Sequence, residues 1–227
     1  FTCGNLAPDS GVPNADWTVF DPAKEVTHFL RPGEDARRIA DLQFYNSYLA
    51  ELTPGFDLAR YSFVLGYFSH LICDNLWGRR IVRPSKQAYA SLFARAENTA
   101  WRELKRDWYG LDHQYVRDHP ESLFWRVFMN TPNPPAYLPF LSEVGLHQSL
   151  DFIRTLYSKP GARELDRNYP YLNKATMAQY VADSTAAVLK IYYKLQEVPA
   201  PANTQTTLAL LTEQEIGPYN LPLGDKV

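Results

Sequence analysis

The sequence has few cysteines, little net charge and no long apolar run. Only two of its 227 residues are cysteines, Cys3 and Cys73, so one disulfide is arithmetically possible but a disulfide-stapled scaffold is excluded. The most apolar segment, residues 61–72, is interrupted by three polar residues. No run approaches the ~18 apolar residues that a membrane-spanning helix needs. The sequence therefore predicts no transmembrane segment.

The net charge is also small, at -2, with an isoelectric point near 6.2. This balance excludes the wide basic surface typical of proteins that bind duplex DNA. It leaves room for a phosphoester substrate, because bound cations can supply positive charge locally. The low cysteine count favours a reducing compartment, the cytoplasm. A secreted location stays open because the sequence begins at Phe1 and not at Met. The oligomeric state is not predicted.

Aromatic residues are abundant, at 14 % of the chain, and no region alternates between polar and apolar residues with a period of two. Strands are therefore expected to be few. Spacings of three and four between apolar residues predict helices over residues 34–52, 57–77, 85–108, 120–129, 141–157 and 174–195. We expect Gly78 to end the second helix and residues 108–113 to interrupt the third. Frequent proline and glycine predict loops over residues 1–33.

The predicted helix over residues 57–77 is apolar on almost every side, which is typical of a buried helix. The sequence thus predicts an all-α, multi-helical single domain packed around this central helix. We expect the domain to span residues 1–197. Residues 198–227 are expected to form a Pro/Thr-rich tail that wraps the surface or is partly disordered.

His70 and Asp74 lie four residues apart on this central helix, so both side chains leave the same face. A histidine and a carboxylate at that spacing can share a metal ion, and zinc accepts both ligand types. The alternative is a hydrogen-bonded pair in which each residue satisfies the other. Two further candidates precede them: Asp9 follows a proline in a Gly/Pro-rich loop, and His28 follows Thr27.

Three motifs in this order carry a resemblance to a known family: residues 4–9 (GNLAPD), 27–29 (THF) and 63–74 (FVLGYFSHLICD). Together they resemble the zinc-dependent phospholipase C family, which is all-α and binds a cluster of zinc ions through His and Asp. The resemblance covers about residues 1–80. Residues 107–112 (DWYGLD) are similar to bacterial members of unassigned activity.

The resemblance implies that Asp9, His28, His70 and Asp74 are the metal ligands, with Asp9 also a candidate general base. The family's later His-x-x-x-Glu pair has no counterpart here, since Glu143 and His147 stand in the reverse order. One to three zinc ions are therefore expected. Second-rank candidates for a further metal or for the substrate are Asp107, Asp112, His113, Arg79 and Arg80.

The function implied by the resemblance is metal-dependent phosphoester hydrolysis, in which a metal-activated water attacks phosphorus. The expected partner is a small phosphoester or a phospholipid headgroup. Two alternatives stay open. One is a zinc-dependent nuclease or phosphomonoesterase, and the other is a helical module that binds metal without catalysis.

Overall fold

A computed structural model describes residues 1–16, 18–31, 39–159, 161, 163–197, 204–219 and 221. Over these residues the chain is mostly helical, and its two strands contain two residues each. The all-α prediction is confirmed. No helix in the described ranges is both long and apolar enough to cross a membrane. Cys3 and Cys73 are both free thiols.

The first part of the chain, up to η3, contains these elements: α1 Thr2–Leu6, η1 Ala7–Asp9, β1 Val12–Pro13, β2 Phe20–Asp21, α2 Lys24–Thr27, α3 Asp41–Phe44, η2 Tyr45–Leu49, α4 Leu58–Trp77 and η3 Gly78–Val82. The rest contains α5 Arg83–Ala88, α6 Ala90–Arg95, α7 Glu97–Asp118, α8 Leu123–Arg126, η4 Phe128–Asn130, α9 Glu143–Ser158, α10 Lys174–Glu197, η5 Thr207–Leu210 and α11 Glu213–Ile216. The strands pair antiparallel, with Val12 opposite Asp21.

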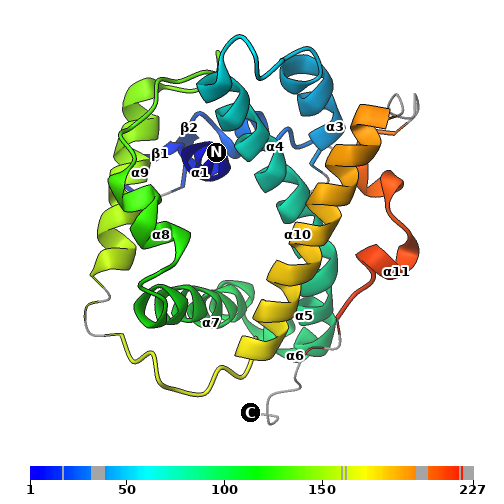
Figure 1. Ribbon diagram of the computed structural model, residues 1–227. Coiled ribbons are helices and arrows are strands. Elements are labelled where there is room, and N and C mark those ends of the chain that lie inside the picture. Colours follow the sequence, from blue (N-terminus) through cyan, green and yellow to red (C-terminus); the bar gives the residue numbers. More distant parts are fainter. Residues whose placement is uncertain are drawn as a thin grey trace.

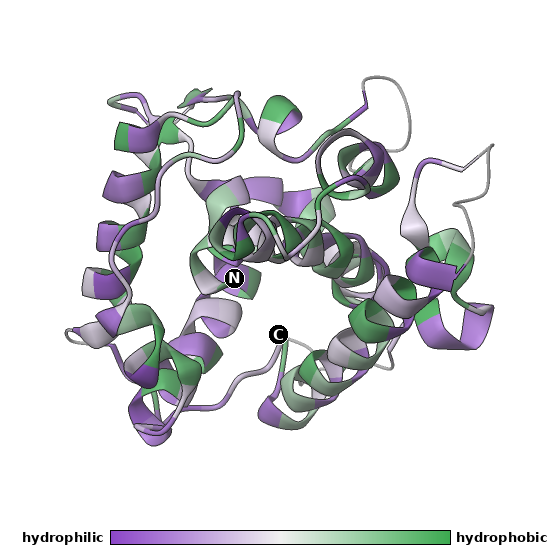
Figure 2. Cartoon of the chain, turned by 45° about the horizontal axis from the view of Figure 1, so that its top comes forward, coloured by the Kyte–Doolittle hydropathy of each residue, from purple (hydrophilic) through white to green (hydrophobic). Residues whose placement is uncertain are grey.

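Helix α4 is the central helix, as predicted. Asp57 caps its N-terminus by accepting a hydrogen bond from the Arg60 amide at 2.9 Å. Its apolar residues are almost fully buried and pack against α1, α3, η2, α10 and η5. Figure 1 shows α9, α7 and α10 along three sides of the molecule, with α4 beside α10. In Figure 2, hydrophobic and hydrophilic residues alternate along the helices, as expected when one face of each helix is buried.

Helix α1 and α4 touch through their backbones. A Cβ atom on Gly66 would lie 2.2 Å from the Phe1 carbonyl oxygen, and one on Gly4 would lie 2.0 Å from that of Phe63. Only glycine allows this approach. The Asn5 side chain then donates a hydrogen bond to the Gly66 carbonyl at 3.2 Å. This contact fixes α1 beside the turn of α4 that carries His70.

The prediction of loops over residues 1–33 is wrong in part, because α1, η1 and α2 lie there. These helices have three to five residues, too few to be stable alone. Their stability comes from packing on α4, which local sequence does not reveal.

Three predicted helix boundaries are also wrong. Gly78 keeps right-handed helical angles (φ −55°, ψ −42°), so the chain continues through η3 into α5 instead of ending. The helix predicted over 85–108 is divided at Tyr89 and Ala96, where the backbone leaves helical angles. Residues 108–113 do not interrupt α7. Gly110 allows close packing there, since a Cβ on it would lie 2.6 Å from the Tyr169 ring.

Of the other predicted helices, two are confirmed and two are present only in part. The predictions for 141–157 and 174–195 are confirmed by α9 and α10. The helix predicted over 34–52 is present only as α3 and η2, with its first residues outside the described ranges. The helix predicted over 120–129 is reduced to α8 and η4.

The described part of the predicted C-terminal tail, residues 204–219, packs on the helical body. Thr207 donates two hydrogen bonds to the Asp41 carboxylate, from its amide at 2.8 Å and its hydroxyl at 2.7 Å. Leu208, Leu211 and Ile216 are buried in the core. Asp41 therefore ties this segment to α3.

The contact between α1 and α4 predicts that alanine changes the free energy of unfolding in opposite directions at Gly66 and at Gly78. Gly66→Ala should lower the free energy of unfolding by about 1–3 kcal/mol, because the new methyl group overlaps α1 backbone. Gly78→Ala is the matched control. Apart from its own helix backbone and its two chain neighbours, no heavy atom of the described residues lies within 4 Å of the position that its new methyl group would take, and it should raise stability by up to about 1 kcal/mol. Denaturant unfolding measures both. Equal effects of the two substitutions would contradict the contact.

Asp41 predicts a pH dependence of stability. Burial raises its pKa to about 6, although hydrogen bonds from Thr207 oppose the shift. Since the folded-state pKa lies above the unfolded value, the folded state binds the proton more tightly between about pH 4 and 6. Relative to Asp41→Asn, the wild type should therefore lose up to about 3 kcal/mol of stability as pH rises through this window. A gain in the same window, measured by unfolding at several pH values, would contradict the assignment.

Candidate metal centre

Four side chains from three segments meet at the middle of α4. Asp9 ends η1, and His28 follows the last residue of α2. His70 and Asp74 lie one turn apart on α4. The structure thus brings together the four residues predicted as ligands, although 65 positions separate the first from the last.

The imidazole nitrogens lie between the two carboxylates. His28 Nε2 is 3.6 Å from Asp9 Oδ1 and 3.6 Å from Asp74 Oδ2. His70 Nε2 is 3.9 Å from Asp9 Oδ2 and 3.6 Å from Asp74 Oδ2. These separations are too long for good hydrogen bonds. The predicted alternative of a simple hydrogen-bonded His70–Asp74 pair therefore does not describe the geometry.

The separations among Asp9, His28 and His70 fit a shared cation, and Asp74 lies outside this group of three. Neighbouring ligand atoms of a tetrahedral zinc site lie about 3.3–3.6 Å apart, given bond lengths of about 2.0–2.2 Å. One ligand atom each from Asp9, His28 and His70 lies within 4.8 Å of the others. Asp74 Oδ2 faces both imidazoles from the other side. Nitrogen and carboxylate oxygen together suit zinc.

His70 is oriented by a backbone contact. Its Nδ1 lies 2.8 Å from the Asn5 carbonyl oxygen, which accepts the Nδ1–H proton. In the neutral ring this leaves a lone pair on Nε2. Nε2 is buried and has no hydrogen-bond partner among the residues that the structure describes. A nitrogen lone pair held in this way is the usual arrangement of a metal-binding histidine.

His28 is positioned in a similar way. It is 5 % exposed, and its Nδ1 lies 3.0 Å from the Thr27 hydroxyl. The Thr27 carbonyl accepts a 2.6 Å hydrogen bond from Tyr67 on α4, which ties the end of α2 to the central helix. The next residue, Phe29, has φ 53°, a left-handed conformation that directs the chain away after His28.

Charges within the cluster perturb its pKa values. Burial favours the neutral form of Asp9, but His70, Lys24 and His28 outweigh it, so the pKa of Asp9 lies below its ordinary value. Burial is the largest effect on His28 and lowers its pKa. For His70, Asp74 and Asp9 outweigh burial and raise the pKa. The negative charge of the carboxylates therefore outweighs burial at His70 but not at His28.

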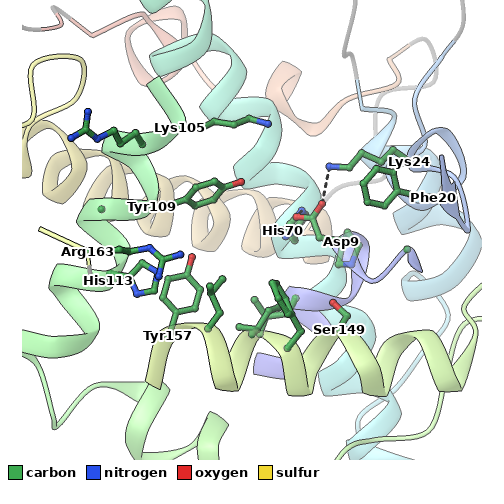
Figure 3. A pocket seen from close by; sticks show the side chains of 18 of the residues that line it. Asp9, Phe20, Lys24, His70, Lys105, Tyr109, His113, Ser149, Tyr157 and Arg163 are labelled. Atoms are coloured by element: carbon green, nitrogen blue, oxygen red, sulfur yellow. Dashed lines mark hydrogen bonds and ion pairs between the residues drawn. The ribbon is translucent and has the colours of Figure 1, made fainter. Parts of the chain in front are cut away.

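The centre opens into two pockets. Asp9 and His70 face a cavity of about 1040 Å³, and His28 and Asp74 face a smaller one of about 570 Å³. Three residues line both pockets: Lys24, Lys105 and Tyr109. Figure 3 shows the larger cavity, with Asp9, His70 and Lys24 on one side and a second group on the other: Tyr109, His113, Tyr157 and Arg163. Lys24 forms an ion pair with Asp9 at 3.1 Å.

The second-rank candidates lie apart from this centre. Asp107 is buried and forms an ion pair with Arg167 at 2.8 Å while accepting a hydrogen bond from the Tyr171 amide. Arg80 is buried against the Glu215 carbonyl and the Tyr219 ring. Both are occupied in holding segments together, so neither is placed to bind metal or substrate.

Two of the remaining second-rank candidates line the pockets. Arg79 lines the smaller pocket, and His113 lines the larger one. Asp112, beside His113 in the sequence, accepts a hydrogen bond from Tyr157 at 3.3 Å. None of the three belongs to the group of Asp9, His28 and His70.

Sequence reasoning missed several residues of the site. Asn5 and Thr27 orient the imidazoles through hydrogen bonds that no spacing reveals. The sequence does contain a pattern that identifies Lys105 and Tyr109. Together with His113 they recur every four residues and so share one face of α7.

Comparisons with known proteins give no relative. No family model, no curated protein and no solved structure matches the chain.

The geometry predicts that zinc stabilises the folded protein. Adding zinc to chelator-treated protein should raise the melting temperature, because the ligands converge only in the folded state. His70→Ala should abolish this rise. His119→Ala is the matched control, since His119 is exposed and pairs with Glu121 away from the centre. An equal response of wild type and His70→Ala to zinc would contradict the assignment.

Proposed function

We propose that the protein is a zinc-dependent phosphoester hydrolase. The observation that carries the proposal is the pair of imidazole nitrogens set between two carboxylates at the edge of a large cavity lined by cationic side chains. The resemblance of residues 4–9, 27–29 and 63–74 to the phospholipase C family supports the same activity.

Asp9, His28, His70 and Asp74 would hold the metal. When bound, zinc supplies a Lewis acid for phosphoryl oxygens and lowers the pKa of a water molecule to about 7. Asn5 and Thr27 keep the two imidazoles in the required orientation. This support matters because loosely held ligands lose affinity and activity.

Asp9 is the residue best placed to accept the proton of the attacking water. Its side chain is 49 % exposed because it faces the cavity, and its lowered pKa keeps it ionised at neutral pH. An ionised carboxylate can accept the proton of an attacking water. The oxygen of that water then bonds to phosphorus while the bond from phosphorus to the ester oxygen breaks. The leaving oxygen takes up the proton held by Asp9 and departs as the alcohol. A phosphodiester would yield a phosphomonoester and an alcohol.

Cationic and hydroxyl groups would hold the substrate. Lys24 and Lys105 line both pockets and are placed to attract a negatively charged phosphoryl group. Tyr109 lines both pockets as well, and burial, with a further contribution from Asp9, raises the pKa of its hydroxyl. Tyr109 therefore stays protonated and can donate a hydrogen bond to a phosphoryl or leaving oxygen.

The lining of the larger cavity restricts which phosphoesters are expected as substrates. Phe152, Ile153 and Leu156 from α9 line the larger cavity, so one side of it is apolar. This side suits a substituent with hydrocarbon or aromatic surface, such as a diacylglycerol or a nucleoside. The phospholipid and nuclease alternatives therefore share one site and differ only in what occupies the apolar side.

A substrate panel tests the proposal. Zinc-loaded protein should hydrolyse bis(p-nitrophenyl) phosphate. Asp9→Asn should lower kcat by about 10²-fold or more, measured at saturating zinc so that weaker metal binding is not the cause. His119→Ala should keep the wild-type rate. Phosphatidylcholine and single-stranded oligonucleotide would then separate the two alternatives. Inactivity of zinc-loaded protein on all these substrates would contradict the proposal and favour a non-catalytic metal-binding module.

A further inference from the structure

The wall opposite the metal centre carries its own polar cluster. Lys105, Tyr109 and His113 recur every four residues along one face of α7 and line the larger cavity. Figure 3 shows His113, Tyr157 and Arg163 grouped together, across the cavity from Asp9 and His70. The hydrolytic step described above uses Lys105 and Tyr109, but it uses none of His113, Tyr157 and Arg163.

His113 is the unusual member. It is 1 % exposed, and neither of its ring nitrogens has a hydrogen-bond partner within the described ranges of the chain. Leaving a buried polar group without a partner costs about 1–3 kcal/mol. The nearest ring, Tyr157, stacks at a tilt with centroids 4.6 Å apart, and its hydroxyl donates to Asp112 instead. Because His113 lines the cavity, its missing partner is expected on a ligand.

The surrounding charges indicate what kind of ligand. Burial, with the positive charge of Arg163, lowers the pKa of His113, so the neutral ring offers one N–H donor and one acceptor. Arg163 is exposed at the same wall, and Lys105 lies two turns of α7 away. Arg167 and Glu164 also line the cavity, and Arg167 forms an ion pair with Asp107. A neutral hydroxyl gains little from this positive charge, whereas an anionic oxygen is attracted by Arg163 while it accepts the N–H of His113.

We propose that His113 and Arg163 form a subsite for a phosphate group other than the one hydrolysed. The preferred substrate would then be a phosphoester that carries a second phosphate. The link from this subsite to catalysis rests on the proposed hydrolase function. The subsite itself should bind phosphate without the metal. The size of the cavity, about 1040 Å³, accommodates a substrate that reaches from Asp9 to His113.

The first experiment measures binding without catalysis. Inorganic phosphate is titrated into chelator-treated protein while the imidazole resonances are followed by NMR. Phosphate should shift the His113 resonances, and the shift should reach a plateau as the phosphate concentration rises. Arg163→Gln and His113→Asn should each weaken binding by about tenfold or more, the equivalent of one lost charge-assisted contact. His119→Ala should bind like wild type. Arg163 is exposed, so its variant separates lost binding from lost folding.

A second experiment distinguishes a substrate phosphate from free phosphate. Zinc-loaded protein is assayed with thymidine 5′-(p-nitrophenyl phosphate) and with the same ester carrying a 3′-phosphate. The added phosphate should lower KM by about tenfold, and Arg163→Gln should remove the difference.

The outcomes separate the two proposals. No phosphate-induced shift at His113, or equal binding by wild type and both variants, would overturn the subsite even if the esters are hydrolysed. Phosphate binding without hydrolysis of either ester would support the subsite and contradict the hydrolase. Phosphate binding with equal KM values for the two esters would overturn the claim that the second phosphate belongs to the substrate.

Discussion

The backbone contact between α1 and α4 is the constraint on which the rest of the site depends. Gly4 and Gly66 let the two helices approach until no Cβ atom would fit between them. That approach places the Asn5 carbonyl 2.8 Å from His70 Nδ1 and so fixes which imidazole nitrogen faces the centre. It also sets the position of η1, which follows α1 directly and ends at Asp9. The ligand from the N-terminal segment and the ligands of the central helix are therefore aligned by one packing contact.

The centre places polar groups where apolar packing would otherwise be favoured. Helix α4 is buried over most of its length, yet it carries His70 and Asp74 in its middle. Burying unpaired imidazole groups is unfavourable unless a partner compensates. Here Asn5 and Thr27 satisfy one nitrogen of each ring, and the other nitrogens are left facing two carboxylates. Under the proposed function, a cation shared by these groups would compensate the burial of the two imidazoles.

Much of the fold was readable from the sequence, but contacts between distant segments were not. Apolar periodicity predicted the all-α class and the helices α4, α9 and α10, because long amphipathic or buried helices carry that period over many residues. The four residues from ordered motifs do converge in space. The short helices α1 and α2 escaped prediction because their stability comes from α4. The sequence did not reveal that Asp107 and Arg80 lie away from the centre, because the residues that hold them, Arg167 and Glu215, are 60 and 135 positions distant in the chain.

The central claim is that one cation is held between His28, His70 and the two carboxylates. Crystals of the protein grown with zinc, measured on both sides of the zinc absorption edge, test it most directly. We predict an anomalous peak about 2.0–2.2 Å from His28 Nε2 and His70 Nε2, with Asp9 and Asp74 completing the ligand set. An ordered site without such a peak, or with zinc bound only elsewhere, would contradict it.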